Sequence, residues 1–247
     1  MRTAAGATHV KIFDDANALA RAAAGRFVET AEAATKASGR FSVALAGGNT
    51  PRKVYEHVAG DESAARVEWS RCHVFFGDER CVPPDHPKSN YRMADETLLS
   101  RVPLPRENVH RAEGTGDPAE NARAYEVELR SFFGDAEWPE FDLVLLGLGD
   151  DGHTASLFPH TPALDAGGAW VAANWVEKLG AFRITLTAPA INHARRVLFL
   201  VSGRSKAARL AEIVRGRFEP GRLPAQSIRP VAGQLEWFVD EEAAREL

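Results

Sequence analysis

Four short runs of apolar residues limit what this chain can fold into more than any other feature of its sequence. Each run is ended by glycine or by polar residues, and the runs cover Phe41–Ala46, Cys72–Phe76, Phe141–Leu146 and Arg196–Val201. Segments with apolar residues at helical spacing separate them. Unbroken apolar strands that alternate with helices are typical of a mostly parallel sheet. We therefore predict a Rossmann-like α/β fold with helices on both faces of the sheet.

Periodicity and start and stop signals place the remaining elements. Helices are predicted at Asp15–Ser38, Pro51–Gly60, Tyr91–Leu99, Ala119–Phe133, Pro189–Asn192 and Ser205–Arg215. Further strands are predicted at Val109–Arg111, Ala169–Val176, Phe182–Leu186 and Leu235–Val239, before a short acidic C-terminal helix. No linker rich in glycine, serine or proline interrupts residues 1–247, so we expect a single domain.

Composition and charge narrow the classes of partner. The chain has 247 residues, of which 45% are hydrophobic and 26% are charged, and its net charge is −4. Such a composition is that of a globular protein and excludes a disordered one. It contains no basic block, so nucleic acid is not expected as a partner. No apolar run reaches the ~20 residues that span a bilayer, so no membrane partner is expected either.

The two cysteines indicate neither a disulfide framework nor a metal centre. Cys72 and Cys81 lack the paired spacing of zinc ligands, and two cysteines in a chain of this length favour a reducing compartment. The N-terminal residues contain no unbroken apolar segment of the kind found in signal peptides. We therefore expect a cytoplasmic protein without a bound metal or cofactor. We expect a monomer, with a dimer as the alternative.

The turn after the first apolar run carries a phosphate-binding pattern. In Ala-Gly-Gly-Asn-Thr-Pro, Gly47 and Gly48 permit close backbone approach to a ligand, and Asn49 lies beside them. Thr50 is the predicted helix cap, because proline follows it at the first helical position. A helix start presents unpaired N–H groups to an anion. A tight turn with a good cap explains the same residues equally well.

Two further turns place charge at the same predicted edge of the sheet. Asp78 and Arg80 follow the second run directly, so Arg80 can hold a phosphate and Asp78 can orient it or another group. The alternative is a solvated charge cluster, although the proline-rich loop after it is typical of a pocket wall. In the last turn, Ser205 is predicted to cap a helix and Lys206 to lie in its first turn. A cation there opposes the helix dipole, and an anionic ligand would resolve that conflict.

The strongest pattern is the turn after Phe141–Leu146, with the sequence Gly-Leu-Gly-Asp-Asp-Gly-His-Thr-Ala-Ser. It delivers His153 to the sheet edge beside Asp151, and imidazole can exchange protons near neutral pH. A lone histidine is more often structural than catalytic. A histidine flanked by Gly and Asp at the end of a strand is an exception, and we interpret His153 as catalytic. Ser-His-Asp chemistry is not favoured, because no Gly-x-Ser-x-Gly elbow is present. Ser156, three residues after His153 on an expected helix, is interpreted as a capping or packing residue.

Together these segments resemble the 6-phosphogluconolactonase family. The matching segments are Ala-Gly-Gly-Asn-Thr-Pro, Phe-Phe-Gly-Asp-Glu-Arg with the later Ser-Asn-Tyr, Gly-Leu-Gly-Asp-Asp-Gly-His-Thr-Ala-Ser-Leu-Phe-Pro and Val-Ser-Gly-Arg-Ser-Lys. The resemblance covers nearly the whole chain, with Asn49 standing where the family often has serine. It implies hydrolysis of 6-phosphogluconolactone to 6-phosphogluconate in the oxidative pentose phosphate pathway. It also implies the fold of the glucosamine-6-phosphate deaminases and ribose-5-phosphate isomerases.

The expected mechanism makes His153 the general base for a water that attacks the lactone carbonyl. His153 then returns the proton to the ring oxygen. Either Asp78 or Asp151 orients the imidazole. Arg80 and Lys206 are expected to hold the phosphate, while a contribution from Arg52 or Arg204 stays open. Backbone N–H groups at Gly47-Gly48 or at Gly152 are candidates to stabilise the tetrahedral oxyanion.

Two other functions compete with lactone hydrolysis. An amino-sugar-phosphate deaminase or isomerase shares the turns, but that family resembles Gly-His-Ile-Ala-Phe-Asn-Glu-Pro where this chain has Gly-His-Thr-Ala-Ser-Leu-Phe-Pro. A sugar-phosphate-sensing domain without turnover is the second rival. Such regulators usually carry a helix-turn-helix, and the residues before Phe41 offer only one predicted helix.

Overall fold

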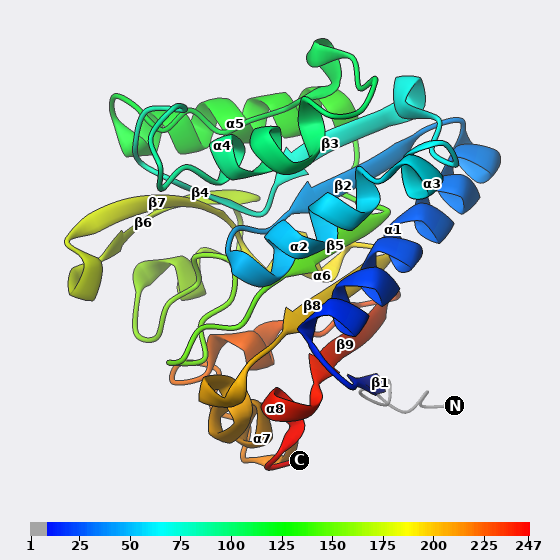
Figure 1. The fold of residues 1–247 in the computed structure, drawn as a ribbon. Helices are drawn as coiled ribbons and strands as arrows, with labels where there is room; N and C mark the ends of the chain where they lie inside the picture. The colour runs from blue at the N-terminus through cyan, green and yellow to red at the C-terminus, as the bar shows by residue number, and fades with distance from the viewer. Residues whose placement is uncertain (1–8) are drawn as a thin grey trace, which may run out of the picture.

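The computed structural model describes residues 9–247, and its centre is a parallel sheet (Figure 1). The strands are β1 (His9–Phe13), β2 (Phe41–Leu45), β3 (Cys72–Phe76), β5 (Leu143–Leu146), β8 (Arg196–Val201) and β9 (Gln234–Asp240). They form a six-stranded sheet in the order β1-β9-β8-β5-β2-β3, and every neighbouring pair is parallel. The prediction of a mostly parallel α/β sheet is confirmed. Strand β1 lacks an apolar run, because none of its side chains is fully buried.

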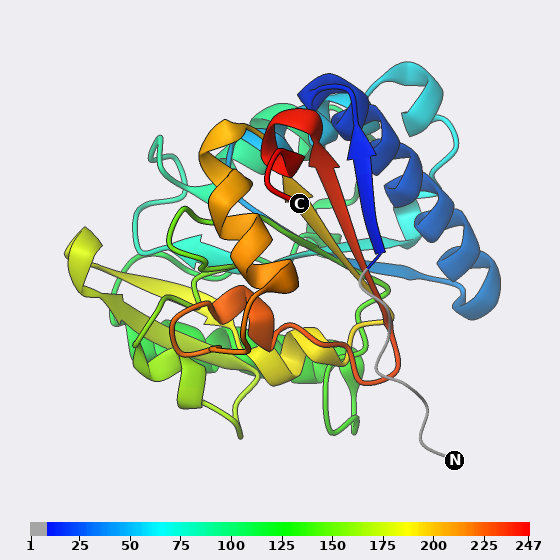
Figure 2. The same cartoon turned by 90° about the horizontal axis from the view of Figure 1, so that it is seen from below.

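Helices cover both faces of this sheet, as predicted. Figure 2 shows α1 and α7 on opposite sides of it. The α-helices are α1 (Ala16–Ser38), α2 (Asn49–Val58), α3 (Asp61–Ala64), α4 (Asn90–Ala94), α5 (Pro118–Phe133), α6 (Ala188–Asn192), α7 (Ala207–Arg215) and α8 (Glu241–Ala244). The predicted helix Tyr91–Leu99 is in fact α4 followed by a π-helical turn, Asp95–Leu99. Within residues 9–247, no helix is long and apolar enough to cross a membrane.

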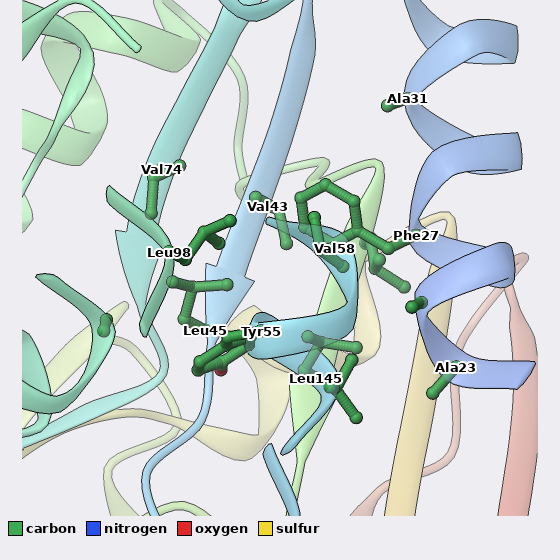
Figure 3. Packing of buried hydrophobic residues seen from close by; sticks show 14 of the residues in the cluster. Ala23, Phe27, Ala31, Val43, Leu45, Tyr55, Val58, Val74, Leu98 and Leu145 are labelled. Carbon is green, nitrogen blue, oxygen red and sulfur yellow. The ribbon is translucent and has the colours of Figure 1, made fainter. Parts of the chain in front are cut away.

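The alternation of strand residues divides the core into two layers. Val43, Leu45 and Leu145 point to the face covered by α1 and α2, where Phe27 and Tyr55 pack between helix and sheet (Figure 3). The intervening strand residues point to the other face, where α5, α6 and α7 contribute buried side chains. Burial on both faces explains why these strands are unbroken apolar runs.

A second, antiparallel sheet lies beside the main one and was not predicted as a unit (Figure 1). It has three strands in the order β4-β7-β6, which are β4 (Asp78–Arg80), β7 (Ala181–Leu186) and β6 (Val171–Val176). Asp78 and Arg80 therefore lie on a strand rather than in a strand-to-helix turn. The strands predicted at Ala169–Val176 and Phe182–Leu186 exist, but they lie outside the parallel sheet: β7 pairs with β4, and β6 pairs with β7.

Several local predictions are wrong in instructive ways. Helix α2 begins one residue before Thr50, and its N-cap is Gly48. Ser205 caps nothing, because a 3-10 turn over Arg204–Lys206 precedes α7. The predicted strand Val109–Arg111 is reduced to a single bridge between Val74 and Val109. At both helix starts a main-chain carbonyl, that of Gly48 or Gly203, accepts the first backbone hydrogen bond, and the predicted side chain does not cap the helix. That residues 1–247 form one domain stays a prediction.

Candidate active site

A cavity of about 370 Å³ opens at the carboxyl ends of the parallel strands. Its walls include Ala46–Gly48 after β2, Gly77 after β3 and Leu145–Gly149 at the end of β5. Strand β2 lies between β3 and β5, so the chain order reverses at this point of the sheet. Ligands of open α/β sheets bind in the crevice at such a switch point. The small antiparallel sheet closes the other side through residues of β4 and β7.

His153 lies in the cavity wall and is paired with Asp151. Its imidazole Nδ1 is 2.5 Å from Asp151 Oδ1, and its backbone N–H donates to the same oxygen at 3.1 Å. The second Asp151 oxygen accepts a hydrogen bond from the Lys178 ammonium. A hydrogen bond from Nδ1–H to a carboxylate leaves the lone pair of the neutral ring on Nε2. No hydrogen bond to Nε2 forms within the part of the chain that the structure describes.

The turn itself explains how the imidazole is fixed. A Cβ on Gly149 would lie 2.0 Å from His153 Nδ1, so only glycine leaves room for the ring. The Gly149 N–H donates to the His153 carbonyl at 2.9 Å, which closes the turn. On its other side the imidazole stacks on Phe158, with ring centroids 4.0 Å apart. Glycine at 149 and an aromatic ring at 158 therefore hold the histidine between them.

No α-helix follows this turn, which corrects the interpretation of Ser156. Ala155 has a left-handed backbone (φ 47°), and a bridge joins Thr154 to Leu157. Ser156 lines the cavity, and its hydroxyl donates to Asp78 Oδ2 at 2.7 Å instead of capping a helix. Strained backbone of this kind is common at functional sites.

The electrostatic environment keeps His153 neutral. Burial lowers its pKa from 6.5 to about 4, and the nearby positive charge of Lys206 acts in the same direction. The carboxylate of Asp78 opposes this shift. At neutral pH the ring is therefore uncharged and can accept a proton at Nε2. Of the two aspartates that the sequence left as candidates, Asp151 contacts the imidazole, whereas Asp78 acts on it through space.

The charged residues of the cavity wall are predominantly basic. They are one carboxylate, Asp78, and four cations, Arg80, Lys178, Arg183 and Lys206. Arg80 on β4 and Arg183 on β7 are register partners, so the two arginines lie opposite each other. In the described range, neither of them forms an ion pair with a carboxylate. Burial and the charge of Arg80 both lower the pKa of Arg183. Two arginines on paired strands, neither with a carboxylate partner among residues 9–247, favour an anionic ligand.

Sequence reasoning missed Arg183 and Lys178. Arg183 lies within a half-buried strand, and only its pairing with Arg80 reveals that it faces the cavity. Lys178 lies in a 3-10 turn between β6 and β7, with its Nζ 4.9 Å from the centre of the Phe158 ring. The available signal was a pair of basic residues, Lys178 and Arg183, on either side of a predicted hairpin. That pair does not indicate a shared cavity until the strand register is known.

Lys206 lines the cavity as predicted, but an aspartate supplies the expected anion. Its ammonium contacts the carboxylate of Asp150, which is 72% exposed. This contact lowers the pKa of Asp150. The Asp150 carboxylate thus supplies the negative charge that the sequence predicted beside Lys206. An exposed carboxylate of this kind can yield its place to a bound anion.

The first turn has a smaller part in the cavity than predicted. Gly47 and Gly48 line it, with Gly48 in a backbone conformation (φ 106°) that favours glycine. Asn49 is exposed and outside the lining, and the Thr50 hydroxyl lies 3.1 Å from that of Ser202.

Of the groups left open, three take no place in the wall. Arg52 lies 3.9 Å from Glu96, and Arg204 is exposed away from the lining. The Gly152 N–H donates to the Gly149 carbonyl, so it is not free for an oxyanion. Among residues 9–247, no three histidine, cysteine, aspartate or glutamate side chains are grouped to hold a metal ion.

Comparison with known proteins agrees with this architecture. The family described as "Glucosamine-6-phosphate isomerases/6-phosphogluconolactonase" matches residues 14–237. A 6-phosphogluconolactonase of Synechocystis is 46% identical over 85% of both chains. The structure of 6-phosphogluconolactonase from Trypanosoma cruzi aligns with a TM-score of 0.87, at 30% identity over 97% of both chains.

A more distant structure shares the fold alone. It is a monomeric glucosamine-6-phosphate deaminase with a TM-score of 0.81 at 20% identity, over 97% of this chain and 100% of its own. The predicted fold, common to sugar-phosphate isomerases and deaminases, is therefore confirmed. On the family match and the 46% identical relative, this chain belongs to the glucosamine-6-phosphate isomerase/6-phosphogluconolactonase family.

Proposed function

We propose that this protein hydrolyses 6-phospho-D-glucono-1,5-lactone to 6-phospho-D-gluconate, the second step of the oxidative pentose phosphate pathway. One observation carries the proposal. A neutral histidine, held by Asp151 and with Nε2 free in the described chain, lies in the wall of a cavity that four cations and a single carboxylate also line. A proton acceptor beside an anion-binding surface is what hydrolysis of a phosphorylated lactone needs. The family and its relatives support the same substrate.

The reaction uses His153 twice. Its Nε2 takes a proton from water as the water oxygen bonds to the lactone carbonyl carbon. The tetrahedral intermediate then expels the ring oxygen, and the imidazolium returns the proton to that oxygen as the ester bond breaks. The new carboxylic acid ionises and releases one proton to solvent. Asp151 stabilises the imidazolium through Nδ1–H, and the Lys178 ammonium donates to the other oxygen of that carboxylate.

Binding and oxyanion stabilisation come from the rest of the wall. Arg80 and Lys206, joined by Arg183, hold the phosphate, and this remote binding energy places the carbonyl near His153. The backbone N–H groups of Gly47 and Gly48 have no acceptor in the described chain and supply donors to an anion. The proposed chemistry requires no metal or cofactor. We further propose a cytoplasmic enzyme that acts as a monomer, with a dimer as the alternative.

The test is hydrolysis of the lactone by the purified full chain. Product is measured with 6-phosphogluconate dehydrogenase and NADP, after subtraction of spontaneous opening. We expect rapid turnover by the wild type and loss of it in His153→Ala. Release of ammonia from glucosamine 6-phosphate instead would establish the deaminase alternative. Binding of sugar phosphates without turnover of either substrate would indicate a sensing domain.

A further inference from the structure

The middle residue of β4 is a buried carboxylate that the proposed mechanism does not use. Asp78 and Arg80 line the cavity, whereas Glu79 between them points the opposite way and is 3% exposed. Within the described residues it forms no ion pair with any cation. A carboxylate in that position is costly unless hydrogen bonds replace the lost water. Its presence therefore calls for a structural reason.

Four donors converge on this carboxylate. Glu79 Oε1 accepts from the backbone N–H groups of Arg80 and Asn90, both at 2.7 Å. Glu79 Oε2 accepts from the backbone N–H of Tyr91 at 2.7 Å and from the Ser89 hydroxyl at 3.1 Å. Burial raises the pKa of Glu79, and the three backbone donors oppose that rise. Three of the four donors belong to residues 89–91, at the start of α4.

The segment held by Glu79 reaches back to both of its neighbours. The Asn90 amide donates to the Asp78 carbonyl at 2.9 Å and to Asp78 Oδ1 at 3.3 Å. The Arg80 guanidinium donates to the Lys88 carbonyl at 2.5 Å. Asn90 also fits closely against the first turn, because a Cβ on Gly47 would lie 1.9 Å from its Oδ1. The loop between β4 and α4 thus fixes two cavity residues from behind.

We propose that Glu79 is a positioning residue for lactone hydrolysis, which holds Arg80 and Asp78 in the cavity wall through Lys88 and Asn90. The inference rests on the proposed function, in which Arg80 binds the phosphate. The role requires a carboxylate, since both oxygens of Glu79 accept from two donors each. A glutamine has one carbonyl oxygen, and its NH2 group would face two donors. Glu79→Gln therefore releases the loop without changing the size of the side chain.

The test is a double-mutant cycle between Glu79→Gln and Arg80→Met. Alone, Glu79→Gln is expected to raise KM for the phosphorylated lactone about tenfold and to lower kcat less, because binding geometry is lost first. In the Arg80→Met background its effect on KM should fall below about twofold. An equal effect in both backgrounds, or an unchanged KM in the single variant, would overturn the proposal.

Two controls separate positioning from loss of stability. Asp142 is also a buried carboxylate; it accepts from the Ser42 N–H and hydroxyl, before the start of β5 and outside the cavity wall. Asp142→Asn should lower the unfolding temperature and leave KM unchanged. Ser89→Ala removes one of the four donors and should change KM in the same direction, by less. If Glu79→Gln does not fold, an unchanged KM in a folded Ser89→Ala overturns the proposal.

Calorimetric measurement of 6-phosphogluconate binding separates a failure of this inference from a failure of the proposed function. If the wild type does not hydrolyse the lactone, the proposed function fails. The positioning role is still tested by the dissociation constant for 6-phosphogluconate, which Glu79→Gln should raise about tenfold and Asp142→Asn should not. Equal dissociation constants for Glu79→Gln and the wild type would contradict the positioning role itself.

Discussion

The two sides of the cavity are built from different kinds of sequence information. The turn at residues 147–158 follows a buried parallel strand, and its proton-handling groups are neighbours in the chain. The opposite side is the antiparallel sheet, where Arg80 and Arg183 come together only through strand pairing. His153 and Asp151 of the first side were identified from the sequence, whereas the pairing of Arg80 with Arg183 on the second side needed the structure. The comparison also predicts a division of labour, with proton transfer on the first side and anion binding on the second.

The largest expected effect lies in the turn. His153→Ala should lower kcat by roughly 10²–10⁴-fold, the range typical of a lost general acid–base, while KM changes little. Initial rates over a range of lactone concentrations, corrected for spontaneous opening, give both constants. If the variant keeps a near-wild-type kcat, the turn does not carry out the proton transfer, and the proposed division of labour is wrong.

The next effect lies in the antiparallel sheet. Arg183→Met should raise KM by roughly 10–150-fold, because a charge-assisted contact contributes about 1.5–3 kcal/mol. Arg183→Lys keeps the charge and is the matched control, with a smaller rise in KM. Steady-state kinetics on the same substrate measure both variants. Should kcat fall while KM stays constant, Arg183 would belong to the proton-handling side instead.

Lys178 connects the two sides, and its removal should have a modest effect. Its side chain is 52% exposed, so its contact with Asp151 is weakened by solvent. We expect Lys178→Met to lower kcat by roughly 2–5-fold, with the exposed Lys11→Met as a control that leaves kcat unchanged. A fall as large as that of His153→Ala would show that the ammonium is part of the proton path.

The smallest effect concerns stability at acid pH. Burial lowers the pKa of His153 and of His73, each from 6.5 to about 4. The folded state therefore binds these protons more weakly than the unfolded state, and the stabilisation is complete above pH 6.5 and is lost as the pH falls towards 4. Urea unfolding between pH 7 and 4 should show a shallower loss of stability in His153→Ala and in His73→Ala. Only His153→Ala should also lose activity, because His73 lies outside the cavity wall. If the unfolding free energy of a variant falls with pH as steeply as that of the wild type, the pKa shift of that histidine is contradicted.

Much of the main sheet could be predicted because its signals are local. The runs that became β2, β3, β5 and β8 are buried on both faces, and burial leaves an unbroken apolar pattern. The helix bounds of α1 follow from Asp15, whose side chain caps the first turn, and from Gly39, whose left-handed backbone ends the helix. Strand β1 escaped prediction because an exposed edge strand needs no apolar run.

The site could be predicted where its residues belong to one turn. It could not be predicted where the strand register determines which side chains face the cavity. Asp151 and His153 are two residues apart, so their contact follows from one backbone conformation. The choice between Asp78 and Asp151 required coordinates, since Asp78 also reaches the cavity. Arg183 faces the cavity only because β7 pairs with β4 in one register, and a shift of one residue would turn it away. Sequence periodicity does not encode that register.

The central claim is that His153 is a neutral base whose Nδ1–H is held by Asp151, and NMR titration of its ring nitrogens tests this most directly. With nitrogen-labelled histidine and His153→Ala to assign the signals, the free protein should show a His153 pKa of about 4. Above that pH it should show the tautomer protonated at Nδ1. A pKa at or above 6.5, or a ring protonated at Nε2 at neutral pH, would contradict the account.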